Sequence, residues 1–174
     1  MLQLLWTDSK NKEVSDNMIE VYPNLFIGNQ NDYEINPSLF RDWRVVHACK
    51  EPYHRNALGY TGRGAPQDSP YYLFLYDKNG HLILNMVDTN SPEFFNDSMI
   101  NEAVRYCIEG LKNHQRVLIH CNQGESRAPS LALLVLRRIG FYKDAFDDAV
   151  NSFENKYPLY NPKHGILLYV KNHW

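Results

Sequence analysis

The sequence predicts a single α/β domain with a central, mostly parallel sheet of about five strands flanked by helices. Strands come first along the chain and are followed by alternating strands and helices, which is typical of a sheet covered on both faces. Residues 116–120 are almost wholly apolar, as expected of a strand in the buried centre of a sheet. The 174 residues, 44% of them hydrophobic, suffice for one complete core. We expect the domain to span residues 18–174, after a loose N-terminal arm at residues 1–17.

The first elements are expected to be strands. Residues 18–28 predict two short strands around a Pro-Asn turn, and residues 42–49 predict a third. Residues 50–70 contain three glycines and three prolines without an apolar period, so we expect a long loop there. Residues 71–76 and 81–87 flank Asp-Lys-Asn-Gly, which predicts a hairpin.

Helices dominate the second half. Ser91-Pro-Glu supplies a cap and a proline, which predicts that a helix begins near Ser91. Apolar residues then recur with helical spacing, and Cys107 lies among them, so we expect Cys107 to pack in the core. After the strand at 116–120, further helices are expected at residues 131–139, 145–153 and 162–174, the first of them ended by Gly140.

Composition argues against several classes of partner. A net charge of -2 gives no general attraction to nucleic acid or to anionic membranes, and no apolar run reaches membrane-spanning length. Three cysteines without an export signal predict reduced thiols and a cytoplasmic protein. The seven histidines show no paired spacing of the zinc type, so we expect neither a metal nor another cofactor.

One run of residues carries the chemistry: His120-Cys-Asn-Gln-Gly-Glu-Ser-Arg127. Cys121 ends the buried strand, Arg127 follows six positions later, and a helix begins at once, with Pro129 near its start. Such a loop can turn its amides inward to bind an anion, and the helix dipole favours negative charge there. The loop residues whose amides would bind a phosphoryl group are Asn122, Gln123, Gly124, Glu125 and Ser126.

The same arrangement suits nucleophilic catalysis. Helix N-termini and nearby cations stabilise a cysteine thiolate, and an arginine binds phosphate oxygens in a planar, bidentate way. Gly124 permits backbone geometry that a Cβ would hinder. The bare spacing of Cys121 and Arg127 can arise by chance, and a buried cysteine is also a common structural choice. The combination of strand, glycine, arginine and helix favours the functional interpretation.

This run resembles the active-site loop of the protein tyrosine phosphatase superfamily. Over about residues 18–172 the chain most resembles the small dual-specificity phosphatases. Tyr22-Pro-Asn-Leu-Phe-Ile-Gly28 is similar to their opening strand pair, His81-Leu-Ile-Leu-Asn-Met-Val-Asp88 to the strand before their catalytic aspartate, and Tyr160-Asn-Pro-Lys-His-Gly-Ile-Leu-Leu to the entry of their last helix. The absence of a Trp-Pro pair before Asp88 favours this branch over the larger tyrosine-specific domains.

The resemblance implies the cysteine-based phosphatase fold, a phosphocysteine intermediate and activity on phosphotyrosine and phosphoserine/threonine of a protein substrate. It implies that Asp88 protonates the leaving group; the alternative is that Asp88 caps the helix expected near Ser91. Asp97 is a weaker candidate because it falls inside that helix. His120 supports the loop in the family, and a simple core histidine is the alternative interpretation.

Ala128 departs from the family pattern, which has a serine or threonine directly after the arginine. That hydroxyl assists departure of the thiolate, so we expect phosphocysteine hydrolysis to be slow relative to its formation. A weakly active phosphate-binding module is therefore an alternative function. A phosphoinositide or RNA 5′-phosphate substrate is another, although Glu125 in the loop disfavours polyphosphorylated ligands unless the basic residues Lys50, Arg55 and Arg63 compensate.

Overall fold

A six-stranded sheet with the order β1-β2-β6-β3-β5-β4 forms the centre of the computed structural model, which describes residues 18–174. The expected arm at 1–17 lies outside these described residues. The four inner strands run parallel, and each edge strand is antiparallel to its neighbour. The strands are β1 (Ile19–Tyr22), β2 (Leu25–Gly28), β3 (Arg44–His47), β4 (Phe74–Tyr76), β5 (Leu82–Leu84) and β6 (Val117–His120). The mostly parallel α/β sheet is thus confirmed, with one strand more than expected.

The central position of β6 follows from its sequence. All four of its side chains are buried, because helices cover both faces of the sheet there. His120, its last residue, lies opposite Gly28 of β2 and His47 of β3. The loops that leave these parallel strands therefore start from the same edge, which is where open α/β sheets place their sites.

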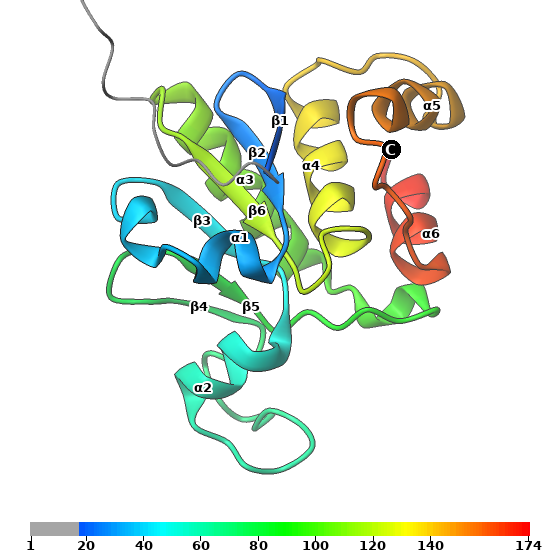
Figure 1. Cartoon of the computed structure of the whole chain (residues 1–174). Helices are drawn as coiled ribbons and strands as arrows, with labels where there is room; N and C mark the ends of the chain where they lie inside the picture. Colours follow the sequence, from blue (N-terminus) through cyan, green and yellow to red (C-terminus); the bar gives the residue numbers. More distant parts are fainter. Residues whose placement is uncertain (1–17) are drawn as a thin grey trace, which may run out of the picture.

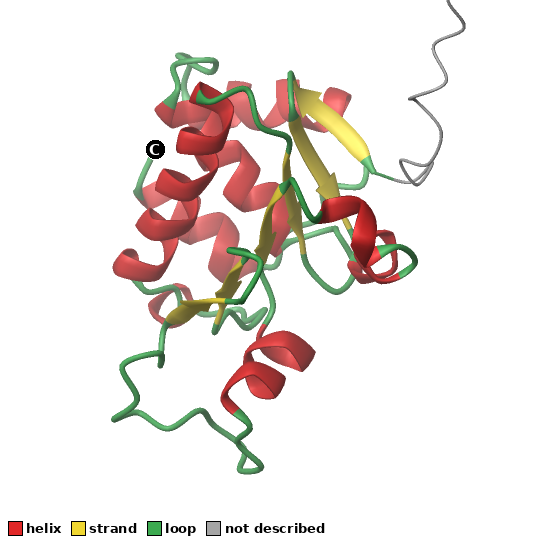
Figure 2. Ribbon diagram, turned by 90° about the vertical axis from the view of Figure 1, so that its left-hand side faces the viewer, coloured by secondary structure: helices red, strands yellow, loops and turns green. Residues whose placement is uncertain are grey.

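The two faces of the sheet are covered unequally (Figure 2). One face carries the larger core, to which α3 (Asp97–Lys112), α4 (Arg127–Arg138), α5 (Phe146–Lys156) and α6 (His164–Asn172) contribute. The other carries a smaller cluster beneath α1 (Gln30–Glu34) and the 3₁₀ turn Pro37–Phe40. Leu118 belongs to the smaller cluster and its neighbour Ile119 to the larger, as the alternation of a strand requires. Every helix in residues 18–174 is too short or too polar to span a bilayer.

The loop expected at residues 50–70 is partly helical. A π-helical turn at Lys50–His54 leads into α2 (Arg55–Leu58), which projects below the body of the molecule in Figure 1. Polar contacts hold this segment in place, and an apolar sequence pattern does not reveal them. The guanidinium of Arg55 pairs with Glu51, and the buried His54 ring lies 3.0 Å from the carbonyl of Tyr71.

Helix α3 begins later than Ser91. Residues Pro92–Phe94 form a separate 3₁₀ turn. Ser91 precedes this turn, and its side chain makes no capping hydrogen bond. The side chain of Asn96 instead accepts hydrogen bonds from the amides of Ser98 and Met99, and this cap sets the start of the helix. Helix α4 begins at Arg127, so the helix expected directly after the Cys121 loop and the apolar helix expected at residues 131–139 are one element. Cys107 is buried in α3, as predicted.

Candidate active site

A cavity of about 390 Å³ opens at the loop that follows β6. Three segments that are distant in sequence line it: the loop after β5, the loop between β6 and α4, and the residues just before α6. Its lining residues are Asp88, Cys121, Asn122, Gln123, Glu125, Ser126, Arg127, Asn161, Pro162 and Lys163.

The loop that holds Cys121 is shaped by a glycine. Cys121 follows β6 directly and is only 2% exposed. Gly124 has a φ of +75°, and a Cβ there would lie 3.0 Å from the carbonyl oxygen of Gly28. The hydroxyl of Tyr157 donates to the Gly124 carbonyl at 2.7 Å. Positive φ and close packing together make glycine necessary at this point of the loop.

Arg127 is held from two sides and keeps one donor free. It is the first residue of α4 and 8% exposed. Its Nη1 donates to the carbonyl of Met86 at 3.0 Å, and its Nη2 donates to Oδ1 of Asn122 at 2.7 Å. Its buried Nε has no hydrogen-bond partner among the described residues. A buried cation with an unused N–H suits an anionic ligand, because an unmet buried donor is costly.

Asp88 lies on the loop after β5 and is joined to the site by Ser126, which belongs to the loop that holds Cys121. Ser126 Oγ donates to Asp88 Oδ1 at 2.9 Å and accepts from the amide of Lys163 at 3.0 Å. Helix α3 is capped by Asn96, so Asp88 does not cap a helix, contrary to the alternative considered from sequence. Asp97 lies outside the cavity and accepts a hydrogen bond from the hydroxyl of Tyr169 at 2.8 Å.

Comparisons with known proteins bear on this fold. No family model and no curated protein matches the sequence. Among solved structures, the Cydia pomonella PTP-2 phosphatase superposes with a TM-score of 0.63 at 18% identity, over 90% of this chain and 89% of that one. DUSP15 gives a TM-score of 0.62 at 18% identity, over 90% and 86%.

A human tyrosine phosphatase-like serine/threonine/tyrosine-interacting protein gives a TM-score of 0.60 at 14% identity, over 90% of this chain and 95% of that chain. This is the fold of the dual-specificity and tyrosine phosphatases. At these identities the likeness establishes the phosphatase fold, and the chemistry must be argued from the site itself.

His120 lies directly before Cys121, on the buried side of the loop. Its ring is fully buried, stacks on Tyr33 at 5.2 Å, and places Nε2 2.6 Å from Nδ1 of His47. Burial lowers the pKa of both rings, so both are neutral near pH 7. His120 therefore acts from behind the loop, and it does not line the cavity.

Lys50, Arg55 and Arg63, which the sequence left open as compensation for the charge of Glu125, do not line this cavity. Lys50 Nζ donates to the carbonyl of Arg63, and Arg55 is paired with Glu51. The lysine that lines the cavity is Lys163, whose Nζ donates to the backbone carbonyl of Asp88 at 3.2 Å.

Sequence reasoning missed Lys163 and its neighbour Asn161. Both belong to the Tyr160-Asn-Pro-Lys run that resembles the entry to the last family helix, which was the available signal. The amide of Asn161 donates to the carbonyl of Glu125 at 2.8 Å, and this bond ties the run to the loop that holds Cys121.

Position 128 offers no hydroxyl to Cys121. Ala128 is fully buried in the first turn of α4. The hydroxyl of Ser130 lies 3.2 Å from that of Tyr160, and the hydroxyl of Ser126 contacts Asp88 and the amide of Lys163. Both neighbouring serines are therefore engaged with other groups.

Proposed function

We propose that this chain is a cysteine-dependent phosphatase that hydrolyses phosphomonoesters on proteins, acting on phosphotyrosine and phosphoserine/threonine. The observation that carries the proposal is the joint lining of one cavity by Cys121, Arg127 and Asp88. A nucleophile, a cation with a free donor and a separately held acid are the groups that phosphoryl transfer needs. The phosphatase fold supports the same class of reaction.

In the first step the thiolate of Cys121 attacks phosphorus in line with the ester oxygen. A P–S bond forms as the P–O bond breaks, and Asp88 donates its proton to the departing oxygen. The guanidinium of Arg127 and the amides of loop residues 122–126 hold the equatorial oxygens while their charge redistributes.

In the second step water attacks the phosphocysteine. The carboxylate of Asp88 accepts a proton from that water, the P–S bond breaks, and the electron pair returns to Cys121 as thiolate. Inorganic phosphate leaves, and Asp88 is again protonated for the next cycle.

The charges around the cavity favour a single phosphate ester on a protein. Besides the proposed catalytic groups Arg127 and Asp88, one cation and one carboxylate line it, those of Lys163 and Glu125. Their charges offset one another, so the surroundings add little attraction for polyphosphorylated inositides or for RNA 5′-triphosphates. We further propose a cytoplasmic protein, because its three cysteines are free thiols.

A phosphate-binding module is the second candidate, and Ala128 is the observation that favours it. A protein that forms phosphocysteine readily but hydrolyses it slowly would stay on its phosphorylated partner. The two candidates differ in turnover and share the same binding groups.

The test is turnover of a phosphotyrosine peptide and a phosphoserine peptide in the presence of a chelator. We expect Cys121→Ser to abolish turnover. Asp88→Asn keeps the acceptor for Ser126 and removes the acid, so it should lower kcat by about 10²- to 10⁴-fold. Asp97→Asn is the matched control, since Asp97 lies outside the cavity and pairs with Tyr169.

Turnover that survives Cys121→Ser would refute the phosphatase. Tight phosphopeptide binding without multiple turnovers would favour the binding module. Faster turnover of inositide phosphates or RNA 5′-triphosphates than of either peptide would refute the proposed protein substrate. The proposed role of Cys121 as nucleophile would still stand.

A further inference from the structure

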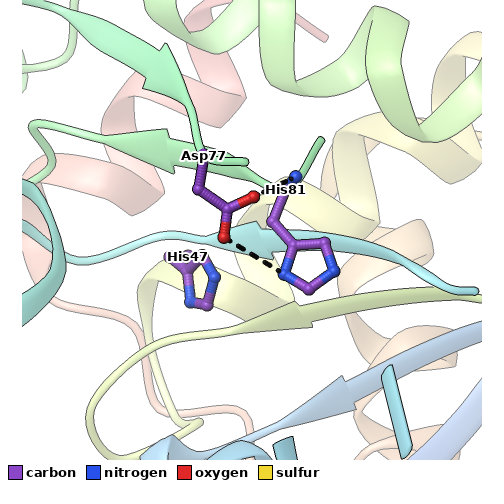
Figure 3. Close-up of side chains that lie close together, drawn as sticks. All are labelled: His47, Asp77 and His81. Carbon is purple, nitrogen blue, oxygen red and sulfur yellow. Dashed lines mark hydrogen bonds and ion pairs between the residues drawn. The ribbon is translucent and has the colours of Figure 1, made fainter. Parts of the chain in front are cut away.

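A second cluster of polar side chains forms where β3 ends and the β4–β5 hairpin turns (Figure 3). His47 is the last residue of β3, Asp77 follows β4, and His81 precedes β5. One nitrogen of each histidine and one carboxylate oxygen all lie within 4.8 Å of one another. None of the three residues lines the cavity that holds Cys121.

His81 presents an unused lone pair to this cluster. Its Nε2 lies 3.1 Å from the backbone carbonyl of Phe40, which can only accept, so Nε2 carries the proton. Its Nδ1 then has a lone pair in the neutral ring. This nitrogen is buried and has no hydrogen-bond partner in residues 18–174. The nearest opposite charge, Asp77 Oδ2, is 3.7 Å away, beyond hydrogen-bond length.

His47 is held in one orientation by its neighbours. Its Nδ1 is 2.6 Å from Nε2 of His120, which leaves its Nε2 for the cluster. The ring of Tyr53 stacks on it at 4.3 Å, and the ring of Tyr33 meets it edge-on at 4.7 Å. A neutral imidazole is the form of histidine that binds a metal ion.

Asp77 completes the set from the solvent side. Its Oδ1 accepts hydrogen bonds from the amides of Asn79 and His81, at 2.8 and 2.9 Å, which fix the turn. Its Oδ2 points toward the ring of His81 (Figure 3). The Asp77 side chain is 25% exposed, whereas that of His81 is 1% exposed. An ion can therefore enter past the carboxylate.

We propose that His47, Asp77 and His81 bind one divalent ion of the zinc class, with the fourth position open to water. Two imidazoles and a carboxylate are a usual ligand set for such ions, and bonds of about 2.0–2.2 Å are normal. The three ligand atoms need only draw together around the ion.

The partners that orient metal-bound histidines are already present. The carbonyl of Phe40 accepts from the far nitrogen of His81, and His120 contacts the far nitrogen of His47. Zinc sites depend on such outer contacts to hold the tautomer and the ring direction.

The ion would tie the end of β3 to the β4–β5 turn, next to His120 and therefore behind the catalytic loop. Because its ligands lie outside the cavity, the ion stabilises the fold and takes no part in phosphoryl transfer. The sequence expectation of no metal rested on spacing along the chain, and these ligands come from two separate segments. The competing explanation is a packed cluster of neutral core histidines.

The experiment measures Zn²⁺ affinity against a competing chromophoric chelator, together with Co²⁺ absorption as a reporter of coordination. Full-length Cys121→Ser protein serves as the background, because a reactive thiolate also binds soft metals. Asp77→Asn keeps the two turn hydrogen bonds, and His81→Gln keeps the donor to Phe40, so both should fold. His173→Gln is the control, since His173 also lies near an aspartate, with its Nε2 3.3 Å from Asp97.

We expect one equivalent of Zn²⁺, intense visible bands with Co²⁺, and a melting temperature that rises with Zn²⁺ concentration. Each ligand substitution should weaken binding by more than the about 10- to 100-fold that loss of an outer contact costs. His173→Gln should bind like the background protein. Absence of stoichiometric binding, or binding unchanged by both ligand substitutions, would overturn the proposal. Neither result affects the turnover measured in chelator, so the metal-site proposal and the phosphatase proposal are tested independently.

Discussion

The three cysteines show how position decides the chemistry of one side chain. Burial raises the pKa of Cys49 and of Cys107 to about 12, so both remain protonated and inert near neutral pH. Cys121 instead lines a cavity beside Arg127 at the start of a helix. The guanidinium of Arg127 opposes the effect of burial on Cys49 but does not overcome it.

At residue 128 we predict that Ala128→Ser speeds the second chemical step. The new hydroxyl can donate to the departing thiolate of Cys121, and one such bond is worth ~1.4 kcal/mol, or about tenfold in rate. Stopped-flow product release from an aryl phosphate should show a burst followed by slow turnover in the unmodified chain. In Ala128→Ser the steady rate should rise and the burst should shrink.

Ala132→Ser provides the control for this substitution. Ala132 is equally buried and lies one helical turn further along α4. It should leave both phases unchanged. If the unmodified chain shows no burst and Ala128→Ser leaves the steady rate unchanged, departure of the thiolate does not limit turnover.

At the level of elements, the start of α6 is packed against the loop that carries Asp88. A Cβ on Gly165 would lie 2.5 Å from the carbonyl oxygen of Thr89 and 2.7 Å from the amide of Ser91. Real Cβ atoms do not approach backbone so closely, so one element must move if this glycine is replaced. Helix α6 therefore helps to set the position of the acid.

We predict that Gly165→Ala lowers kcat by about 10- to 100-fold, because misplacing a catalytic group by about 1 Å has effects of this size. Alkylation of Cys121 by iodoacetate should continue at its usual rate, since the nucleophile loop is not displaced. Gly64→Ala is the control, because no atom lies within 4 Å of the added Cβ. Equal kcat values for the two variants would contradict this role of α6.

Elements set by local sequence were predictable, and those set by distant contacts were not. The buried strand β6, its loop and α4 follow one another directly, so their order could be predicted from one run of residues. The start of α3 could not, because Ser91 and Asn96 are both good caps and only Asn96 forms the bonds. The approach of Lys163 to Asp88 depends on how α6 packs, which no local pattern encodes.

For the whole molecule, the neutral buried histidines make stability depend on pH. Burial lowers the pKa of His47 and of His120 below the ordinary value near 6.5. In the folded protein both rings stay neutral, whereas in the unfolded chain they take up protons as the pH falls through about 6.5. Below about pH 6.5 the unfolded state then binds more protons than the folded state. The free energy of unfolding is therefore undiminished by these rings above that pH and falls below it.

We predict that the free energy of unfolding falls between pH 7.5 and pH 5, by up to about 1.4 kcal/mol per pH unit for each of the two rings. Urea titrations in chelator measure it. His47→Asn, which keeps a donor for His120, should reduce the slope of the unfolding free energy against pH. His114 is exposed, so His114→Asn should leave that slope unchanged. Stability that is constant or rises as the pH falls would contradict the neutral state of these rings.

Trapping the phosphocysteine intermediate shows whether Cys121 carries the phosphoryl group. The chain would be mixed with a phosphotyrosine peptide, quenched in acid within the burst and digested for mass spectrometry. We expect phosphate on the peptide that contains Cys121, with Ala128→Ser lowering its amount and Cys121→Ser eliminating it. Turnover of the same peptide with Cys121 never phosphorylated, or turnover by Cys121→Ser, would contradict it.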